Sequence, residues 1–264
     1  MSVFKGNVVV LVGASRGIGK QLAKQLAAQG ACLVLAARSE NQLNQVAKDC
    51  KNIGASVKVV ITDITRKQSC RELIREAVRE FGKIDTLLYN AGSGKTGYFA
   101  THSNIDYISD EIRLNYYGLV YCLHYALPYL RQEKGRVVGV CSMGGIVSLP
   151  GTAGYNASKH AMRGFLNTLR VEMLGTGVTL TTVYLSAVRT EAYLDEVGEK
   201  ATDIPASTPE QAASNIIRAA AKRKREVIPS LEGRLLFIFH RLLPGLTEKI
   251  IAGSSMNYAK DREP

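Results

Sequence analysis

Aromatic residues and long apolar runs are scarce in this sequence. It has no tryptophan and only six phenylalanines among 264 residues, so a core must come mainly from Val, Leu, Ile and Ala. A helix that crosses a bilayer needs about 20 consecutive apolar residues, and no run approaches that length. The opening stretch MSVFKGNVVVLVG lacks the small-residue cleavage site of a secretory signal. These absences argue against a membrane-spanning protein and predict a cytoplasmic one.

Cysteines are few and follow no ligand spacing. The chain has five, an odd number, and none forms a CxxC pair: Cys32, Cys50, Cys70, Cys122 and Cys141. A disulfide framework needs paired cysteines, and a zinc site needs closely spaced ligands. The sequence therefore predicts reduced thiols, as in a cytoplasm, and no metal site.

Acidic residues are also in short supply. The chain has 23 Asp and Glu against 34 Lys and Arg, which gives a formal net charge of +11. Nucleic acid, an anionic cofactor, an anionic lipid surface or simple solubility would each suit such a balance. The one dense basic run, KRKRE at Lys222–Glu226, has no interleaved aromatic residues and fits the end of a helix, where the helix dipole favours cations. We therefore expect no nucleic-acid partner.

The chain does contain a regular alternation of short apolar runs and amphipathic stretches. Helices are expected after the first run and near Glu40–Lys51, Arg66–Phe81, Asn104–Leu130 and Thr152–Leu174. Near-continuous apolar strands imply that helices cover both faces of a sheet. The pattern predicts one Rossmann-type α/β domain over residues 1–230, a doubly wound parallel sheet of about seven strands flanked by helices. The strand-like runs are NVVVLV, ACLVLAA, SVKVVIT, IDTLLYN, GRVVGVCS and VTLTTVYLS, with REVIPS as a seventh.

A glycine turn joins the first strand to the first helix. The segment VGASRGIGK carries Gly13, Gly17 and Gly19. Small residues there allow backbone amides at a helix N-terminus to approach a pyrophosphate. A tight turn that binds no ligand would use the same glycines, so this pattern alone leaves both explanations open.

The end of the second strand distinguishes NAD from NADP sites. An NAD site presents a carboxylate to the ribose diol, whereas an NADP site presents a cation to the 2′-phosphate. Here Ala36 and Ala37 stand where an acid would be, Arg38 follows them, and Arg16 lies within the glycine turn. Two solvated surface arginines would look the same. Cations at both places and no acid favour NADP(H).

A second glycine-rich stretch, GSGKT within Asn90–Phe99, has the end of a P-loop. A complete P-loop would place its first glycine at position 89, which is Tyr89. Half of the motif does not predict a triphosphate site, so this segment needs another explanation.

Three residues form a candidate proton-transfer group. Tyr155 and Lys159 lie four apart at the start of a helical stretch and share one face. A free phenol, with a pKa of about 10, is a poor base at neutral pH, but a neighbouring ammonium favours the phenolate. Ser142, at the end of a strand-like run, offers a hydroxyl to the same substrate oxygen. Each feature alone also has a commonplace structural explanation.

In this order, the motifs resemble those of the short-chain dehydrogenase/reductase family over roughly residues 5–225. GASRGIG is similar to the family's TGxxxGIG, with Val12 replacing the usual Thr, and YNAG is similar to its NNAG. TDIT and LNYYG supply Asp63 and Asn115. Ser142, Tyr155 and Lys159 match the rest of the catalytic tetrad. The resemblance implies that GSGKT is the lip of a substrate cleft.

The resemblance also implies roles for these residues. Tyr155 would be the general acid/base, and Lys159 would bind the nicotinamide ribose and favour the phenolate. Ser142 would orient the carbonyl, and Asn115 would support a water that links Lys159 to solvent. Asp63 would bind adenine. The implied cofactor-binding set is Gly13, Ser15, Arg16, Gly17, Ile18, Gly19, Arg38, Asp63, Ile64, Asn90, Ala91, Gly92, Tyr155, Lys159, Val188 and Thr190.

One position departs from the family pattern. After the sixth strand, Ser186-Ala187 stands where the family usually has Pro-Gly. Val188 and Thr190 still align with residues that meet the nicotinamide carboxamide. The change alters the stiffness of this loop but removes no catalytic group.

The C-terminal part carries an apolar helical extension, residues 231–252, and a polar tail, 253–264, that we expect to fray. Pro244-Gly245 should break any helix here. The apolar surface could contact a membrane from the cytoplasmic side, or it could pack on the body or on a second subunit. The tails of microsomal hydroxysteroid dehydrogenases and ketosphinganine reductases look similar, which favours a lipophilic substrate by analogy. Its apolar residues are Leu235, Leu236, Ile238, Phe239, Leu242 and Leu243.

The sequence thus predicts an NADP(H)-dependent oxidoreductase that acts on an apolar, lipid- or steroid-like ketone or secondary alcohol, as a homodimer or homotetramer. One alternative is a ketoacyl-thioester reductase, whose acidic carrier protein would suit the basic surface. Another is a non-catalytic NADP-binding regulatory protein. The presence of Asn115, Ser142, Tyr155 and Lys159 together argues against the latter.

Overall fold

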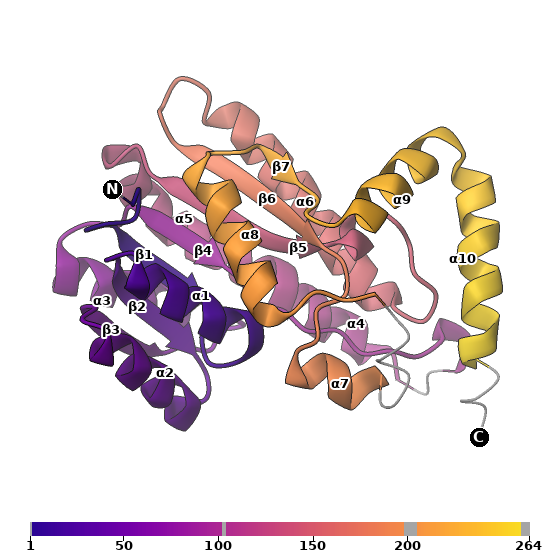
Figure 1. Cartoon of the computed structure of the whole chain (residues 1–264), viewed down its shortest axis with the longest axis horizontal. Helices are drawn as coiled ribbons and strands as arrows, with labels where there is room; N and C mark the ends of the chain where they lie inside the picture. The colour runs from indigo at the N-terminus through magenta and orange to yellow at the C-terminus, as the bar shows by residue number, and fades with distance from the viewer. Residues whose placement is uncertain (1, 102–103, 198–204, 260–264) are drawn as a thin grey trace.

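A computed structural model describes residues 2–101, 104–197 and 205–259 of the chain. Seven strands form one sheet in the order β3-β2-β1-β4-β5-β6-β7, and every neighbouring pair is parallel (Figure 1). This confirms the predicted Rossmann-type sheet. The strands are β1 Val8–Val12, β2 Cys32–Ala37, β3 Val57–Ile61, β4 Thr86–Tyr89, β5 Arg136–Ser142, β6 Thr179–Leu185 and β7 Glu226–Val227.

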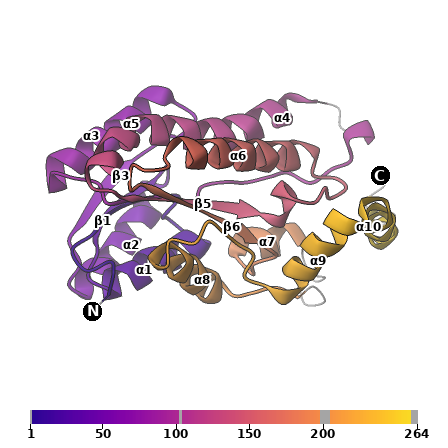
Figure 2. The same ribbon diagram turned by 90° about the horizontal axis from the view of Figure 1, so that it is seen from above.

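Helices cover both faces of the sheet, in two layers that Figure 2 shows edge-on. Val8, Val10 and Val12 of β1 pack with α3, α5 and α6, whereas Val9 and Leu11 pack with α1, α2 and α8. Successive side chains of a strand point to opposite faces, so a strand buried on both faces must be apolar throughout. The helices of these two layers include α1 Gly17–Ala28, α2 Glu40–Asn52, α3 Lys67–Phe81, α5 Gly118–Gln132, α6 Ala153–Glu172, α7 Glu191–Val197 and α8 Pro209–Ala221, with 3-10 turns at Phe99–Thr101 and Met143–Gly145.

The strand order reverses between β1 and β4. In a doubly wound sheet, ligands bind at such a switch point, beyond the carboxyl ends of the strands. Because all strands are parallel, the segments that follow β1, β2, β3, β4, β5 and β6 lie along this one edge. Those segments carry most of the residues that the sequence analysis selected.

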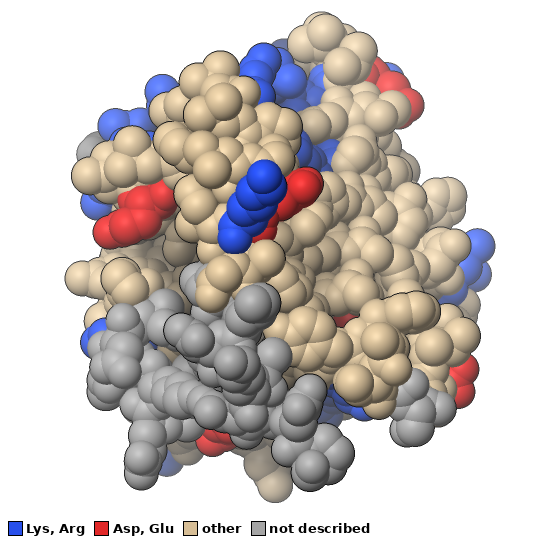
Figure 3. All heavy atoms as spheres, turned by 90° about the vertical axis from the view of Figure 1, so that its right-hand side faces the viewer, with Lys and Arg blue, Asp and Glu red and all other residues tan. Residues whose placement is uncertain are grey.

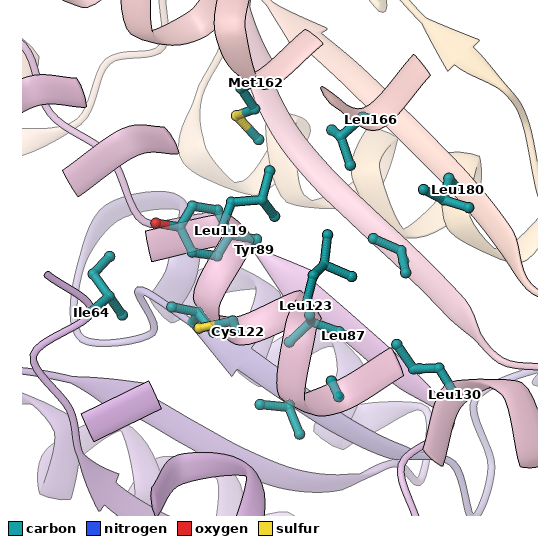
Figure 4. Close-up of a cluster of buried hydrophobic side chains, with 14 of the residues drawn as sticks. Ile64, Leu87, Tyr89, Leu119, Cys122, Leu123, Leu130, Met162, Leu166 and Leu180 are labelled. Atoms are coloured by element: carbon teal, nitrogen blue, oxygen red, sulfur yellow. The ribbon is translucent and has the colours of Figure 1, made fainter. Parts of the chain in front are cut away.

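The single long helix predicted for Asn104–Leu130 is wrong in its middle. The segment consists of α4 Asp106–Glu111, a π-helical stretch η2 Ile112–Tyr117, and α5 Gly118–Gln132. The Tyr89 hydroxyl donates to the carbonyl oxygen of Leu114 at 2.7 Å, within the π-helical stretch. Tyr89 lies in the core beneath this segment, beside Leu119 and Cys122 (Figure 4). A buried polar group that reaches into a helix is a common cause of local rewinding, and such π-segments often occur at functional sites.

The C-terminal extension forms two helices beyond the last strand, at the right of Figure 1. α9 spans Leu231–Leu242 and α10 spans Pro244–Ala259, so the predicted break at Pro244 is confirmed. β7 is shorter than the run REVIPS suggested, because Pro229 has no N–H with which to extend the ladder. α10 continues past residue 252, into the segment from 253 onward that the sequence predicts to fray. Across the described ranges, no helix combines the length and apolarity needed to cross a membrane.

Candidate active site

The glycine turn after β1 closes against the segment after β4. Gly13 has a φ of +82°, and a Cβ there would lie 2.7 Å from the Cα of Ala91. Asn90 donates from Nδ2 to the carbonyl oxygen of Gly13 at 2.9 Å. A Cβ on Gly19 would overlap the same carbonyl. Only glycine at these positions lets the turn close and brings its backbone amides within reach of a ligand. This arrangement fits a cradle for a dinucleotide.

The segment after β6 reaches the same turn. Gly17 has a φ of +53°, and a Cβ on it would lie 3.1 Å from Cγ2 of Thr190. Thr190 Oγ1 also accepts the backbone N–H of Tyr193 at the start of α7. Val188 is buried and pairs with Ser207 as an isolated bridge. Segments that are far apart in the sequence thus converge on the first turn of α1.

Arg16 and Arg38 lie exposed at the ends of β1 and β2. Neither takes part in an ion pair among the residues that the structure describes. Asp63, after β3, accepts the N–H and the hydroxyl of Thr65 at 3.0 and 2.7 Å. Burial raises the pKa of this carboxyl, but the Thr65 hydrogen bonds and the nearby Arg38 and Arg66 outweigh burial and lower it. Arg38 and Arg66 therefore stand near a carboxylate whose pKa is held below its usual value.

Not every predicted cofactor residue offers its side chain to this edge. The Ile64 side chain is buried in the core below η2 (Figure 4), so only its backbone can meet a cofactor. Ile18 packs partly against the opposite core cluster, and Ser15 is half-buried in the glycine turn.

Tyr155 lies in a slot between two glycines. A Cβ on Gly94 would lie 2.6 Å from Cδ2 and 2.8 Å from Cγ of the ring. On the other edge, a Cβ on Gly144 would lie 3.3 Å from Cε1. The backbones after β4 and β5 therefore hold the ring between them, and GSGKT packs on Tyr155. The loop after β5 is in turn fixed by Ser142, whose Oγ accepts the Gly144 N–H at 3.1 Å.

Lys159 and Asn115 meet at Gly92. A Cβ on Gly92 would lie 3.0 Å from Lys159 Nζ and 2.9 Å from Asn115 Oδ1. The Lys159 side chain is almost completely buried, its Nζ lies 5.5 Å from the centroid of the Tyr155 ring, and it donates to the carbonyl of Val140 at 3.4 Å. A buried lysine side chain therefore lies directly beside the phenol ring.

Asn115 sits fully buried in the π-helical stretch and binds the segment after β4 twice. Its Oδ1 accepts the Ser93 N–H at 3.0 Å, and its Nδ2 donates to the Ser93 carbonyl at 2.8 Å. Nδ2 also donates to Ser158 Oγ, which donates to the carbonyl of Tyr155 at 2.7 Å. The structure thus brings together Asn115, Tyr155 and Lys159, with Ser142 in the adjoining loop.

Sequence reasoning missed three contributors: Glu111, Ser158 and the contact of Gly94 with Tyr155. Glu111 is a buried carboxylate at the end of α4, and its Oε1 accepts the backbone N–H of Lys95. The one available signal was its spacing, four residues before Asn115. Spacing alone could not reveal the long-range partner.

The departure at Ser186 has a structural counterpart. Ser186 Oγ lies 2.8 Å from Ser230 Oγ, and Ser230 caps the N-terminus of α9 by accepting the Gly233 N–H. A side chain that proline lacks therefore ties the segment after β6 to the start of the C-terminal extension.

A cavity of about 640 Å³ opens between the loop after β5, the 3-10 turn at Phe99, α6 and α10. Its lining reaches Asn156, the residue after Tyr155, but does not include Tyr155 itself. Asn156 and His160 of α6 and Glu248 of α10 supply its polar groups. Its apolar lining includes Tyr98, Phe99, Leu149, Pro150 and Ile251.

Comparison with known proteins gives a consistent result. A model of the family described as short chain dehydrogenase matches residues 7–200. The 11-beta-hydroxysteroid dehydrogenase A of Sesamum indicum is 34% identical over 256 residues, covering 92% of this chain and 74% of that protein. The 11-beta-hydroxysteroid dehydrogenase 1A of Arabidopsis thaliana is 32% identical over 258 residues, with the same coverage. A third relative, 11-beta-hydroxysteroid dehydrogenase-like 2 of Arabidopsis thaliana, is 29% identical and covers 97% of this chain and 83% of its own length.

The matched residues contain the glycine turn, the slot around Tyr155 and every strand from β1 to β6. An oxidoreductase of this family acts on hydroxyl or carbonyl groups with a nicotinamide dinucleotide, and the cradle at Gly13, Gly17 and Gly19 fits such a group. This chain belongs to the short-chain dehydrogenase family.

Proposed function

We propose that the protein is an NADP(H)-dependent reductase or dehydrogenase of an apolar ketone or secondary alcohol. The observation that carries the proposal is the slot that holds Tyr155 between Gly94 and Gly144, with buried Lys159 beside the ring. It lies at the switch-point edge of the sheet, where the glycine turn also lies. A fixed phenol next to a buried cation suits proton exchange with a substrate oxygen.

In this proposal, the bound dinucleotide supplies or accepts the hydride. Tyr155 passes a proton to, or takes one from, the substrate oxygen, and the Ser142 hydroxyl bonds that oxygen. Lys159, buried beside the ring, binds the ribose. Asn115 holds the Ser93 backbone in place and supports a proton path from Lys159 to solvent.

The preference for NADP(H) rests on Arg16 and Arg38. Both are exposed, and Ala36 and Ala37 leave no carboxylate at the end of β2 to repel a 2′-phosphate. Arg38→Ala should weaken NADPH binding about tenfold or more and leave NADH binding within about twofold, because only the phosphate contact is lost. Titration with both cofactors measures this. Arg131→Ala, at the opposite edge where α5 ends before β5, is the matched control. Equal loss for both cofactors would contradict the assignment.

The proposed substrate class draws on the cavity along α6, whose lining includes Asn156, next to Tyr155 in the chain. Its lining is mostly apolar, and its size of about 640 Å³ lies within the range of pockets for drug-sized ligands. Relatives whose names describe hydroxysteroid dehydrogenases agree with an apolar alcohol or ketone.

The test is NADPH oxidation over a panel of ketones, from small aryl ketones to steroids, ketosphinganine and ketoacyl thioesters. We expect turnover of an apolar ketone, with kcat lowered by on the order of 10²–10⁴ in Tyr155→Phe. Preference for a carrier-bound thioester would favour the ketoacyl reductase. NADPH binding without turnover of any ketone would favour a regulatory protein. Activity that survives in Tyr155→Phe would refute the mechanism.

We also propose that α9 and α10 contact an anionic membrane surface. Leu235, Ile238, Phe239 and Leu242 of α9 are exposed, and Figure 3 shows that the described surface on the α10 side is largely uncharged. Two cations stand beside this face: Arg163 and Arg241, with His240, line a cavity of about 430 Å³ between α6 and α9. Apolar side chains next to cations suit the boundary between acyl chains and anionic headgroups.

Co-sedimentation with vesicles tests this contact. The wild type should bind vesicles that contain anionic lipid more strongly than neutral ones, and Leu235→Glu should reduce binding several-fold. Leu174→Glu, at a leucine after α6 that is more exposed than Leu235, is the control and should bind as the wild type does. Binding that is unchanged in Leu235→Glu would rule out α9 as the contact.

A further inference from the structure

Glu111 is a buried carboxylate that the proposed chemistry does not use. Only 5% of its surface is exposed, at the junction between α4 and the π-helical stretch η2. A charged group is rarely buried without partners, because desolvation disfavours it. Two of its contacts are with the segment after β4, which packs on the Tyr155 ring, and with the start of α6, which carries Tyr155.

The first partner is the segment after β4. Glu111 Oε1 accepts the backbone N–H of Lys95 in a short hydrogen bond. One helical turn later, Asn115 binds both backbone groups of Ser93. Gly94 therefore lies between two residues that are each fixed to the same helix, one by Glu111 and one by Asn115.

Gly94 makes the contact that matters for the proposed chemistry. Its backbone lies against the base of the Tyr155 ring, because an added Cβ would be 2.6 Å from Cδ2 and 2.9 Å from the tyrosine Cβ. The hydroxyl end of the ring is not part of this contact. The segment therefore fixes the orientation of the Tyr155 ring and leaves the tyrosine hydroxyl free to meet the substrate.

The second partner is the start of α6. A Cβ on Gly154 would overlap Glu111 Oε2 and would lie 3.3 Å from the Tyr107 ring. Gly154 directly precedes Tyr155. Glu111 therefore touches both the backbone that carries the tyrosine and the segment that supports its ring.

We propose that Glu111 is a positioning residue for Tyr155: it holds Lys95 so that Gly94 fixes the ring against Gly144. The proposal rests on the proposed role of Tyr155 in proton transfer. This role gives a function to Glu111, a buried carboxylate outside the tetrad. It also explains the segment GSGKT, which forms the part of the slot that Glu111 holds in place.

Replacing Glu111 tests whether its hydrogen bond to the Lys95 backbone positions Tyr155. Glu111→Gln keeps an oxygen acceptor for the Lys95 N–H and removes the charge, whereas Glu111→Leu removes the acceptor. We expect kcat to fall roughly 10- to 100-fold in Glu111→Leu and to stay within about threefold of the wild type in Glu111→Gln, because misplacing a reacting group is costly. KM for NADPH should change little in either, since the glycine turn and Arg38 are untouched. Asp110→Asn, an exposed neighbour on α4, is the control.

Three results would overturn the proposal. They are unchanged kcat in Glu111→Leu, equal losses in Glu111→Gln and Glu111→Leu, and a shift of the kcat–pH profile in Glu111→Gln, which would show action through charge. If Tyr155→Phe retains activity, the proposed function itself fails. If Tyr155→Phe is inactive while Glu111→Leu is fully active, only the positioning role fails.

Gly94→Ala keeps the test decisive if Glu111→Leu does not fold. Gly94 does not have a positive φ, so alanine strains no backbone there and adds only a methyl group against the ring. We expect kcat to fall at least about tenfold while NADPH binding persists. Gly164→Ala is the matched control, because a Cβ at that position of α6 meets nothing within 4 Å. Equal activity of the two alanine variants would contradict the slot.

Discussion

The cofactor side and the substrate side of the switch-point edge are built by different means. On the cofactor side, Gly13, Gly17 and Gly19 allow close approach: a Cβ on Gly13 or Gly19 would collide with backbone, and one on Gly17 would crowd Thr190. On the substrate side, the segment after β4 is held by the side chains of Glu111 and Asn115, which reach it from a rewound helix. Close backbone approach requires glycine, so it can be recognised in the local sequence. A long-range hydrogen bond joins residues that are distant in the sequence, so the local sequence does not reveal it.

The largest expected effect tests the cofactor side. Gly13→Ala combines a positive φ with a Cβ 2.7 Å from the Ala91 backbone. We expect NADPH affinity to fall by about 100-fold or more, because the turn can no longer close and the loss of several contacts exceeds about 2.7 kcal/mol. Isothermal titration with NADPH measures the loss.

Gly54→Ala separates the two causes. Gly54 has a similar φ of +88°, but a Cβ there meets nothing within 4 Å. This variant should lower stability by roughly 1–2 kcal/mol through backbone strain and leave NADPH affinity unchanged. If both variants bind NADPH equally well, close approach at Gly13 does not explain the cradle.

This difference explains what the sequence could and could not predict. The alternation of apolar runs predicted the sheet, and the spacing of Tyr155 and Lys159 on one helix predicted their proximity, because both follow from local periodicity. The π-helical stretch was missed, since it depends on Tyr89, which lies far from Leu114 in the sequence and bonds it only in the fold. Glu111 and the Ser186–Ser230 contact were missed for the same reason.

A smaller effect is expected from the Ser186–Ser230 contact, which joins the segment after β6 to the start of α9. Ser186→Ala and Ser230→Ala each break the 2.8 Å hydrogen bond between the segment after β6 and the start of α9. In a double-mutant cycle we expect a coupling of about 0.5–1.5 kcal/mol in the free energy of unfolding, measured by denaturant titration. Ser230→Ala alone should be worse than Ser186→Ala, since Ser230 also caps α9. A coupling of zero would mean that the extension is not tied to this segment.

The smallest effect concerns Asp63, where the cofactor side depends on charge. The Thr65 hydrogen bonds and the Arg38 and Arg66 charges hold the folded-state pKa of this carboxyl below its ordinary value, despite burial. A lowered folded-state pKa stabilises the fold above the ordinary pKa near 4, and this stabilisation is lost as pH falls through the folded value. The unfolding free energy of the wild type should therefore exceed that of Asp63→Asn at pH 7, by well under about 1 kcal/mol because the group is partly exposed, and the difference should shrink toward pH 3. Denaturant titrations at both pH values measure it. A difference that grows on acidification would mean that Asp63 is strained as an anion, and that Arg38 is not available to stabilise it.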